Sequence, residues 1–167
     1  TLSDIYNVYF AEFLETFSQT AIPDYLPHTF FIEGGGLAVE NALKVAFDWK
    51  VRKNISNGKG EKGSKIIHFN QAFHGRTGYT LSLTNTTDPR KTMYFPKFDW
   101  PRINNPKLAF PIKDNVLEEV KKNEKIAVEQ IKTAINIHPN DIAASIIEPI
   151  QGEGGDNHFR DEFFVAL

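Results

Sequence analysis

Three consecutive glycines at residues 34–36 constrain the fold of this chain more than any other feature of its sequence. They follow an aromatic and β-branched run at residues 28–32, which predicts a strand, and they precede a helical pattern over residues 37–53. A turn without side chains at the start of a helix lets backbone N–H groups approach a ligand, and the positive end of the helix favours a phosphate. A plain tight turn explains three glycines equally well, so this turn alone leaves both interpretations open.

Strand and helix patterns alternate along the rest of the chain. Residues 4–20 and 116–137 have the helical spacing of apolar side chains, and residues 65–69 and 141–147 are apolar runs that predict strands. Residues 85–114 contain five prolines and predict a long irregular insertion. The alternation predicts an α/β domain with a mainly parallel sheet and flanking helices, in which ligands bind at the carboxyl ends of the strands.

Two more loops follow predicted strands and carry side chains suited to ligand binding. The second loop contains Phe73, which can stack on a flat ring, and Arg76, which can grip a carboxylate with two hydrogen bonds. The third loop, residues 148–156, contains Glu148 and Glu153, which can hold an arginine or a polar network beside a ligand. For each residue alone, a core phenylalanine, a surface arginine or a solvated carboxylate is the commoner explanation.

Other binding patterns fit less well. Val39 stands where a dinucleotide-binding turn has its last glycine, and Asn70 and Gln71 stand where that fold has an acidic residue. This disfavours a nucleotide-binding oxidoreductase. A hydrogen-bonded structural histidine is a better interpretation of His74 than a base, and no set of metal ligands is expected.

The composition disfavours some classes of binding partner. A net charge of -2 argues against nucleic acid as a partner, and no apolar run approaches the roughly 20 residues that cross a bilayer. The chain has no cysteine, which leaves the cytoplasm as the simplest location. Its only methionine is Met93 and it ends soon after a predicted helix start, so we expect a piece of a longer chain.

Taken together, the three loops resemble one family. Their order and spacing are similar to those of the class III aminotransferases of pyridoxal-phosphate (PLP) fold type I, and the resemblance implies that residues 1–167 are part of the PLP-binding large domain. The motifs that carry it are Gly-Gly-Gly-Leu-Ala-Val-Glu-Asn-Ala-Leu-Lys at residues 34–44, Ala-Phe-His-Gly-Arg at 72–76 and Glu-Pro-Ile-Gln-Gly-Glu-Gly-Gly-Asp at 148–156. Residues 79–85, 95–103 and 155–159 look most like the members that act on the ε-amino group of L-lysine.

The resemblance implies a role for several residues at the cofactor. Gly35 and Gly36 would bind the PLP phosphate through backbone N–H groups, and Phe73 would stack on the pyridine ring. Glu148 would support the polar network on the cofactor side. The chain departs from many family members at residue 34, where a glycine replaces Ser or Thr, so phosphate binding would depend more on the backbone.

The resemblance also implies how substrates bind. Arg76 would hold the α-carboxylate of lysine so that the ε-amine reaches the cofactor. Glu153 would pair with an arginine while lysine is bound and release it for 2-oxoglutarate. That arginine, the Schiff-base lysine and the aspartate at the pyridinium nitrogen lie downstream in the family, so no catalytic residue is assigned within these 167 residues.

The implied activity is transfer of the ε-amino group of L-lysine to 2-oxoglutarate, which gives 2-aminoadipate 6-semialdehyde and glutamate in lysine catabolism. The parent protein would be a homodimer, as family members are. Two alternatives stay open: a related ω-aminotransferase acting on 4-aminobutyrate or ornithine, and a non-catalytic fragment or binding module, because the 167 residues lack the Schiff-base lysine.

Overall fold

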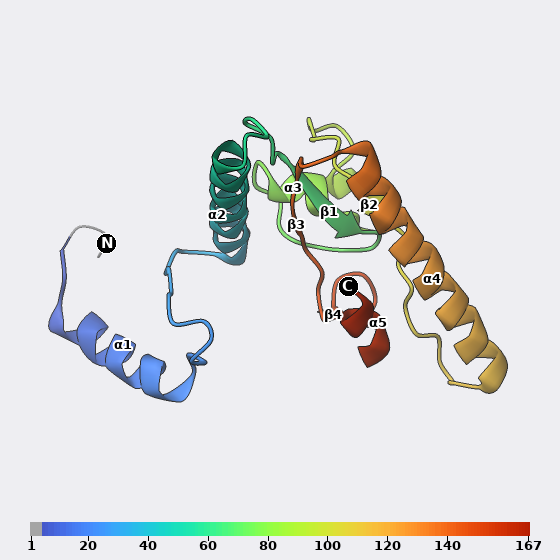
Figure 1. Cartoon of the computed structure of the whole chain (residues 1–167). Coiled ribbons are helices and arrows are strands. Elements are labelled where there is room, and N and C mark those ends of the chain that lie inside the picture. The colour runs from blue at the N-terminus through green and yellow to red at the C-terminus, as the bar shows by residue number, and fades with distance from the viewer. Residues whose placement is uncertain (1–4) are drawn as a thin grey trace. The chain divides into compact units, whose positions relative to one another are not determined.

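Residues 5–167 are described by the computed structural model, and the chain divides between Ile32 and Glu33 into two units (Figure 1). Each unit is defined by contacts within itself. No helix among the described residues is both long and apolar enough to cross a bilayer.

The first unit is built on helix α1, Val8–Thr20. The side chain of Asn7 accepts a hydrogen bond from the Phe10 N–H at 2.8 Å and so caps the helix start. The predicted start at residue 4 lies outside the described residues. The helix has no buried residue. The ring of Phe31, from the segment after the helix, packs with three rings of the helix, and neighbouring centroids lie 5.5 to 6.2 Å apart: Phe10, Phe13 and Phe17.

The strand predicted at residues 28–32 is absent from this unit, where the segment has no regular secondary structure. A strand requires a neighbour that pairs with its backbone N–H and C=O groups, and no strand lies among residues 5–32. The aromatic and β-branched composition therefore identified a segment suited to a sheet, but composition does not supply the pairing partner.

The second unit contains the parallel sheet that the sequence predicts. Strands β1 (Lys65–Phe69), β2 (Arg102–Ile103) and β3 (Ile142–Ser145) form it in the order β2-β1-β3, and both pairings are parallel. A separate antiparallel pair joins β4 (Ile150–Gln151) to β5 (Asn157–His158). The central strand β1 has the predicted bounds, and the mainly parallel α/β architecture is confirmed.

Helices flank this sheet. The long helices α2 (Gly35–Ser56) and α4 (Asp114–Ile137) confirm the two helical patterns within a few residues. The short helices are α3 (Thr80–Leu83) and α5 (Asp161–Ala166), and a 3-10 turn, η1, spans Pro89–Lys91. The stretch predicted as irregular thus contains η1 and the edge strand β2 between its loops.

The core of the second unit has two sides because successive side chains of β1 point to opposite faces of the sheet. On one face Ile67 and Phe69 pack with the apolar sides of α4 and α5, including Ala127 and Phe163. On the other face Ile66 packs with residues of α2, α3 and the segment before β2: Leu43, Leu83 and Trp100. In Figure 1 the long helices α2 and α4 accordingly lie on different sides of β1.

Strand β3 is less buried than its sequence predicts. The apolar run at residues 141–147 suggested burial on both faces, but Ile142 is only partly buried and Ser145 is exposed. The reason is its position in the sheet, because within the described residues β3 pairs with β1 alone. No strand of residues 5–167 pairs with its second edge.

Candidate cofactor and substrate site

The glycine turn forms the start of helix α2. Gly34 is the residue before the helix and has a φ of 88°, a conformation that glycine adopts without a steric penalty. The first backbone hydrogen bond of the helix runs from Ala38 N–H to the Gly34 carbonyl at 3.0 Å, so the N–H groups of Gly35, Gly36 and Leu37 have no partner inside the helix. No side chain caps this end. The turn therefore offers backbone donors and a positive helix end to an anion.

The glycine turn is in contact with the second loop, as the predicted site requires. A Cβ atom built on Gly75 would lie 2.9 Å from the Gly36 Cα, and one built on Gly36 would lie 3.2 Å from Thr77 Cγ2. Gly75 also has a φ of 116°. The two loops thus approach so closely that residue 75 must be glycine.

A buried carboxylate on α2 joins these two loops. Glu40 is 8% exposed, and its Oε1 accepts one hydrogen bond from Thr77 Oγ1 at 2.5 Å and another from the Tyr79 N–H at 2.7 Å. Thr77 is further fixed by Thr80, whose Oγ1 accepts from the Thr77 N–H at 2.9 Å. We call the set Glu40, Thr77 and Tyr79 the Glu40 junction. It holds the residues that follow Arg76 against the helix that begins with the glycine turn.

The second and third loops meet at Phe73 and Glu148. The Oε1 atom of Glu148 accepts a hydrogen bond from the Phe73 N–H at 2.7 Å. Burial raises the pKa of the Glu148 carboxyl, the Phe73 hydrogen bond opposes that rise, and the nearby Glu153 charge adds to it. Glu148 therefore fixes the backbone of the aromatic residue predicted to stack on the cofactor ring.

A network of neutral amides also ties the third loop to the second. Asn157 Nδ2 donates to Gln151 Oε1 at 3.0 Å, to Gln71 Oε1 at 3.2 Å and to the Gly154 carbonyl at 3.0 Å. Asn105 Nδ2 donates to the same two oxygens, to Gln71 Oε1 at 2.9 Å and to Gln151 Oε1 at 2.7 Å. We call Gln71, Asn105, Gln151 and Asn157 the amide junction. The backbones touch here as well, because a Cβ atom on Gly154 would lie 2.2 Å from the Gln71 carbonyl oxygen.

The two predicted substrate residues lie at the exposed tips of these loops. Arg76 is exposed and makes no ion pair within the described part of the chain. Glu153 is exposed and pairs with Lys91 of η1. Both side chains thus lie at the surface: Arg76 can bind a ligand directly, and Glu153 would have to exchange its ion pair with Lys91.

His74, between Phe73 and Gly75, is a buried histidine. Burial lowers its pKa to about 4, so the ring is neutral at neutral pH. Its backbone N–H donates to Thr84 Oγ1 at 3.1 Å, while its Nε2 atom has no partner among residues 5–167. The enclosed ring fits a structural position, but the ring hydrogen bond expected from the sequence is not formed at Nε2.

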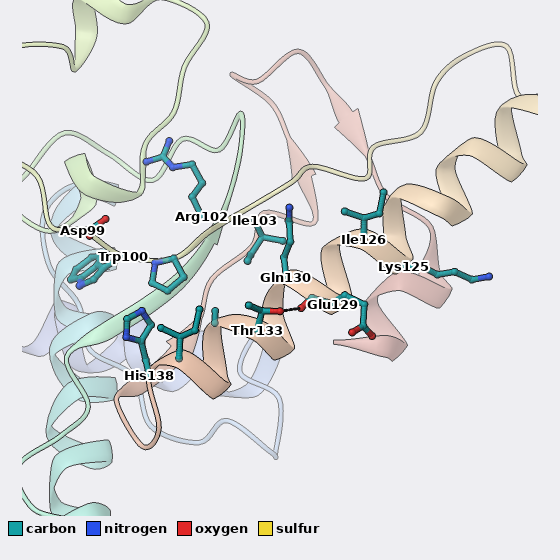
Figure 2. Close-up of a pocket in the computed structure, with 13 residues that line it drawn as sticks. Asp99, Trp100, Arg102, Ile103, Lys125, Ile126, Glu129, Gln130, Thr133 and His138 are labelled. Atoms are coloured by element: carbon teal, nitrogen blue, oxygen red, sulfur yellow. Dashed lines mark hydrogen bonds between the residues drawn. The ribbon is translucent and has the colours of Figure 1, made fainter.

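A groove of about 780 Å³ lies elsewhere, between strand β2 and helix α4 (Figure 2). In Figure 2 the side chains of Ile103 and Gln130 lie next to each other between the strand and the helix. The residues predicted for cofactor or substrate binding are not in its lining, which is made by Asp99, Trp100, Pro101, Arg102, Ile103, Lys125, Ile126, Glu129, Gln130, Thr133, Ala134, Ile137 and His138. The candidate site is therefore the loop cluster and not this groove.

Sequence reasoning missed the two junctions. A signal for the first was present, because Glu40 shares the helical spacing of Leu43 and Phe47 and so places a charge on an apolar face. A charge on such a face requires polar partners, although the sequence does not identify them. The amide junction left no comparable signal, since asparagine and glutamine are common in exposed loops.

The fold and the loop cluster place this chain in a known class of enzymes. The family described as aminotransferase class III matches residues 5–167, and the chain belongs to that family. It is 51% identical over 166 residues to the L-lysine-epsilon aminotransferase of Mycobacterium tuberculosis, a match that covers 99% of this chain and 36% of that relative. It is 35% identical over 152 residues to the mitochondrial 4-aminobutyrate aminotransferase of Homo sapiens, covering 80% of this chain and 30% of the relative.

Structural comparison gives the same result. The solved structure of lysine aminotransferase from M. tuberculosis in the internal aldimine form matches with a TM-score of 0.93 and 51% identity, over 99% of this chain and 37% of that one. The chain thus spans about a third of the length of the relatives that it matches. These matches confirm the predicted family and its fold, and with them PLP as the cofactor on which the family depends.

Proposed function

We propose that this chain is part of an enzyme that transfers the ε-amino group of L-lysine to 2-oxoglutarate, giving 2-aminoadipate 6-semialdehyde and glutamate. The observation that carries the proposal is the meeting of three loops: the glycine turn contacts the second loop at Gly75, and the second loop contacts the third at Glu148 and Gly154. The identity to L-lysine-epsilon aminotransferases favours lysine over 4-aminobutyrate, whose aminotransferases are less similar.

The backbone of the glycine turn can accommodate the phosphate of PLP. A Cβ atom on Gly35 would meet nothing within 4 Å, and the helix start has no side-chain cap, so space and donors are both present for a phosphate. In the proposed site Gly35 and Gly36 bind the phosphate, Phe73 stacks on the ring and Glu148 holds Phe73 in place. When bound, PLP supplies an electron sink at the reacting carbon.

Arg76 gives the site its choice of amine. Its guanidinium binds the α-carboxylate of lysine through two parallel hydrogen bonds, which turns the far end of the substrate towards the cofactor. The exposed, unpaired side chain of Arg76 in the described chain is suited to this role, because no internal ion pair has to break first.

Glu153 supplies the second part of the selectivity. It holds a cationic side chain while lysine is bound and releases it when 2-oxoglutarate, with its second carboxylate, takes the place of lysine. The ion pair that Glu153 forms with Lys91 is evidence that this carboxylate accepts a cation in its present position. The Schiff-base lysine is not assigned to any residue of this chain. A homodimer and a cytoplasmic location stay predictions.

The test uses the complete gene product, loaded with PLP and given L-lysine and 2-oxoglutarate. We expect glutamate to form, with a higher kcat/KM for L-lysine than for L-ornithine or 4-aminobutyrate. In an Arg76→Met variant we expect the KM for L-lysine to rise about 100-fold, because a charged bidentate contact is lost. Arg52, an exposed arginine paired with Asp48, gives the matched control Arg52→Met, which should keep the KM. Absence of glutamate in the unmodified protein would refute the proposal.

A further inference from the structure

Glu40 is a buried carboxylate that the proposed reaction does not use directly. It is 8% exposed, and among residues 5–167 its partners are neutral hydrogen-bond donors and not cations. Burying a carboxylate without a cation is unfavourable in itself. The two hydrogen bonds that it accepts are therefore the contacts that indicate its role.

The hydrogen bonds of Glu40 show which part of the molecule benefits. Both run to the residues just after Arg76, namely Thr77 and Tyr79. Glu40 itself lies on α2, whose first residues Gly35 and Gly36 form the phosphate turn. One oxygen atom thus links the helix of the phosphate turn to the loop that carries the guanidinium.

The surrounding packing leaves this loop little freedom to move against the helix. Thr77 Oγ1 also lies 2.8 Å from Thr80 Oγ1, and a Cβ atom on Gly78 would lie 3.5 Å from Glu40 Oε1. Gly75 lies against Gly36 on the other side of Arg76. Arg76 is therefore held on both sides, by a backbone contact before it and by the Glu40 junction after it.

We propose that Glu40 is a positioning residue that fixes the distance between the phosphate turn and the Arg76 guanidinium, and so selects the length of the diamino acid substrate. This rests on the proposed function. A substrate whose carboxylate is bound by Arg76 and whose far amine must reach a cofactor anchored at the turn has to span that distance. L-ornithine is one methylene shorter than L-lysine, so a fixed distance discriminates between the two.

The experiment compares two replacements of Glu40 in the complete gene product loaded with PLP. Glu40→Leu removes the acceptor, whereas Glu40→Gln keeps an oxygen that can accept both hydrogen bonds. For Glu40→Leu we expect the ratio of kcat/KM for L-lysine to that for L-ornithine to fall about tenfold, the equivalent of one lost charged hydrogen bond. For Glu40→Gln we expect a ratio within about threefold of the unmodified protein. The ratio does not depend on how much protein is active.

Hydrogen exchange gives a readout that does not involve activity. In Glu40→Leu the backbone amides of residues 77–79 should exchange about tenfold faster, because the Tyr79 N–H loses its acceptor. In Glu40→Gln they should exchange at nearly the unmodified rate. If Glu40→Leu fails to fold, the pair Thr77→Val and Thr77→Ser replaces it, since only serine keeps the hydroxyl donor.

The outcomes are separable. Equal selectivity ratios and equal exchange rates in the folded leucine and unmodified proteins would overturn the positioning role while leaving the proposed function intact. Equal losses for both substrates would also overturn it, because they indicate general damage to the site. If the unmodified protein does not convert L-lysine, the proposed function fails, and the exchange rates still decide whether Glu40 holds the loop.

Discussion

The second loop is held by the Glu40 junction on the side of the glycine turn and by the amide junction on the side of the third loop, and the two junctions differ in chemistry. In the Glu40 junction one carboxylate oxygen accepts two hydrogen bonds. In the amide junction four neutral side chains share their hydrogen bonds, two donors to two glutamine oxygens. Charged acceptors form the stronger bonds, whereas a network distributes its free energy over many weaker ones.

This difference matches what each junction holds. The single strong acceptor lies next to Arg76, whose position is proposed to set the substrate length. The distributed network supports the base of the third loop, while the tip of that loop, Glu153, stays exposed and carries only a surface ion pair with Lys91. In a site that binds two substrates in turn, Arg76 would be held in a fixed position, whereas Glu153 would exchange its ionic partner.

The largest effect is expected from a backbone clash at the amide junction. In Gly154→Ala the new methyl group would lie 2.2 Å from the Gln71 carbonyl oxygen, a backbone atom that cannot rotate away. We expect the free energy of unfolding to fall by about 3 kcal/mol in urea titrations. Gly152→Ala is the matched control in the same loop, because nothing lies within 4 Å of its Cβ position. Equal stability of the two variants would show that the third loop is not clamped to Gln71.

Acid should lower the free energy of unfolding, because the second loop contains the buried His74. Burial lowers the pKa of His74 to about 4, below its usual 6.5, so the stability it contributes is complete above pH 6.5 and is lost as the pH falls towards 4. Between pH 6.5 and pH 5 that loss amounts to about 2 kcal/mol. Burial and the charge of Arg102 also lower the pKa of His68 to about 4. His68 therefore makes the free energy of unfolding depend more steeply on pH. Glu148, whose pKa burial raises, acts in the opposite direction, because its protonation favours the folded state at low pH.

The measurement for this second prediction is urea unfolding of the complete gene product across that pH range. A His74→Gln variant should lose less stability on acidification than the unmodified protein. Replacement of the exposed His28 by glutamine is the control for the loss of one surface histidine. A slope that is the same in all three proteins would argue that His74 is not enclosed in the folded protein.

The sequence predicted the helices and strands better than the contacts between residues far apart in the chain. Residues 65–69 were correctly identified as a strand from their local pattern, and in the fold β2 and β3 supply the pairing partners. The run at residues 28–32 looked equally suited to a strand, yet pairing requires a neighbour that the local pattern cannot specify. Arg76 and Phe73 were placed correctly in a loop after β1, but the contacts of Glu40 and Asn157 join residues far apart in the chain. Such contacts follow from the tertiary fold and not from spacing.

The smallest effect is expected at the exposed tip of the third loop. Lys91→Met removes the surface ion pair with Glu153, and we expect the free energy of unfolding to change by no more than about 0.5 kcal/mol, because solvent screens such pairs. Lys121→Met, which breaks the exposed pair with Glu118, should behave in the same way. A loss above about 1 kcal/mol for Lys91→Met alone would mean that the tip is as firmly anchored as the base of the loop.

The contact between Gly36 and Gly75 also bears on the order in which the protein folds. Strand β1 lies between these two glycines in the chain, so their contact closes a loop that contains β1, and we expect this contact to form together with the sheet. An isolated α2 peptide would present the same N–H groups at its end but without the opposing wall of the second loop. Affinity for inorganic phosphate during refolding should thus emerge together with the sheet and later than helical circular dichroism, which makes the anion a kinetic reporter of chain assembly.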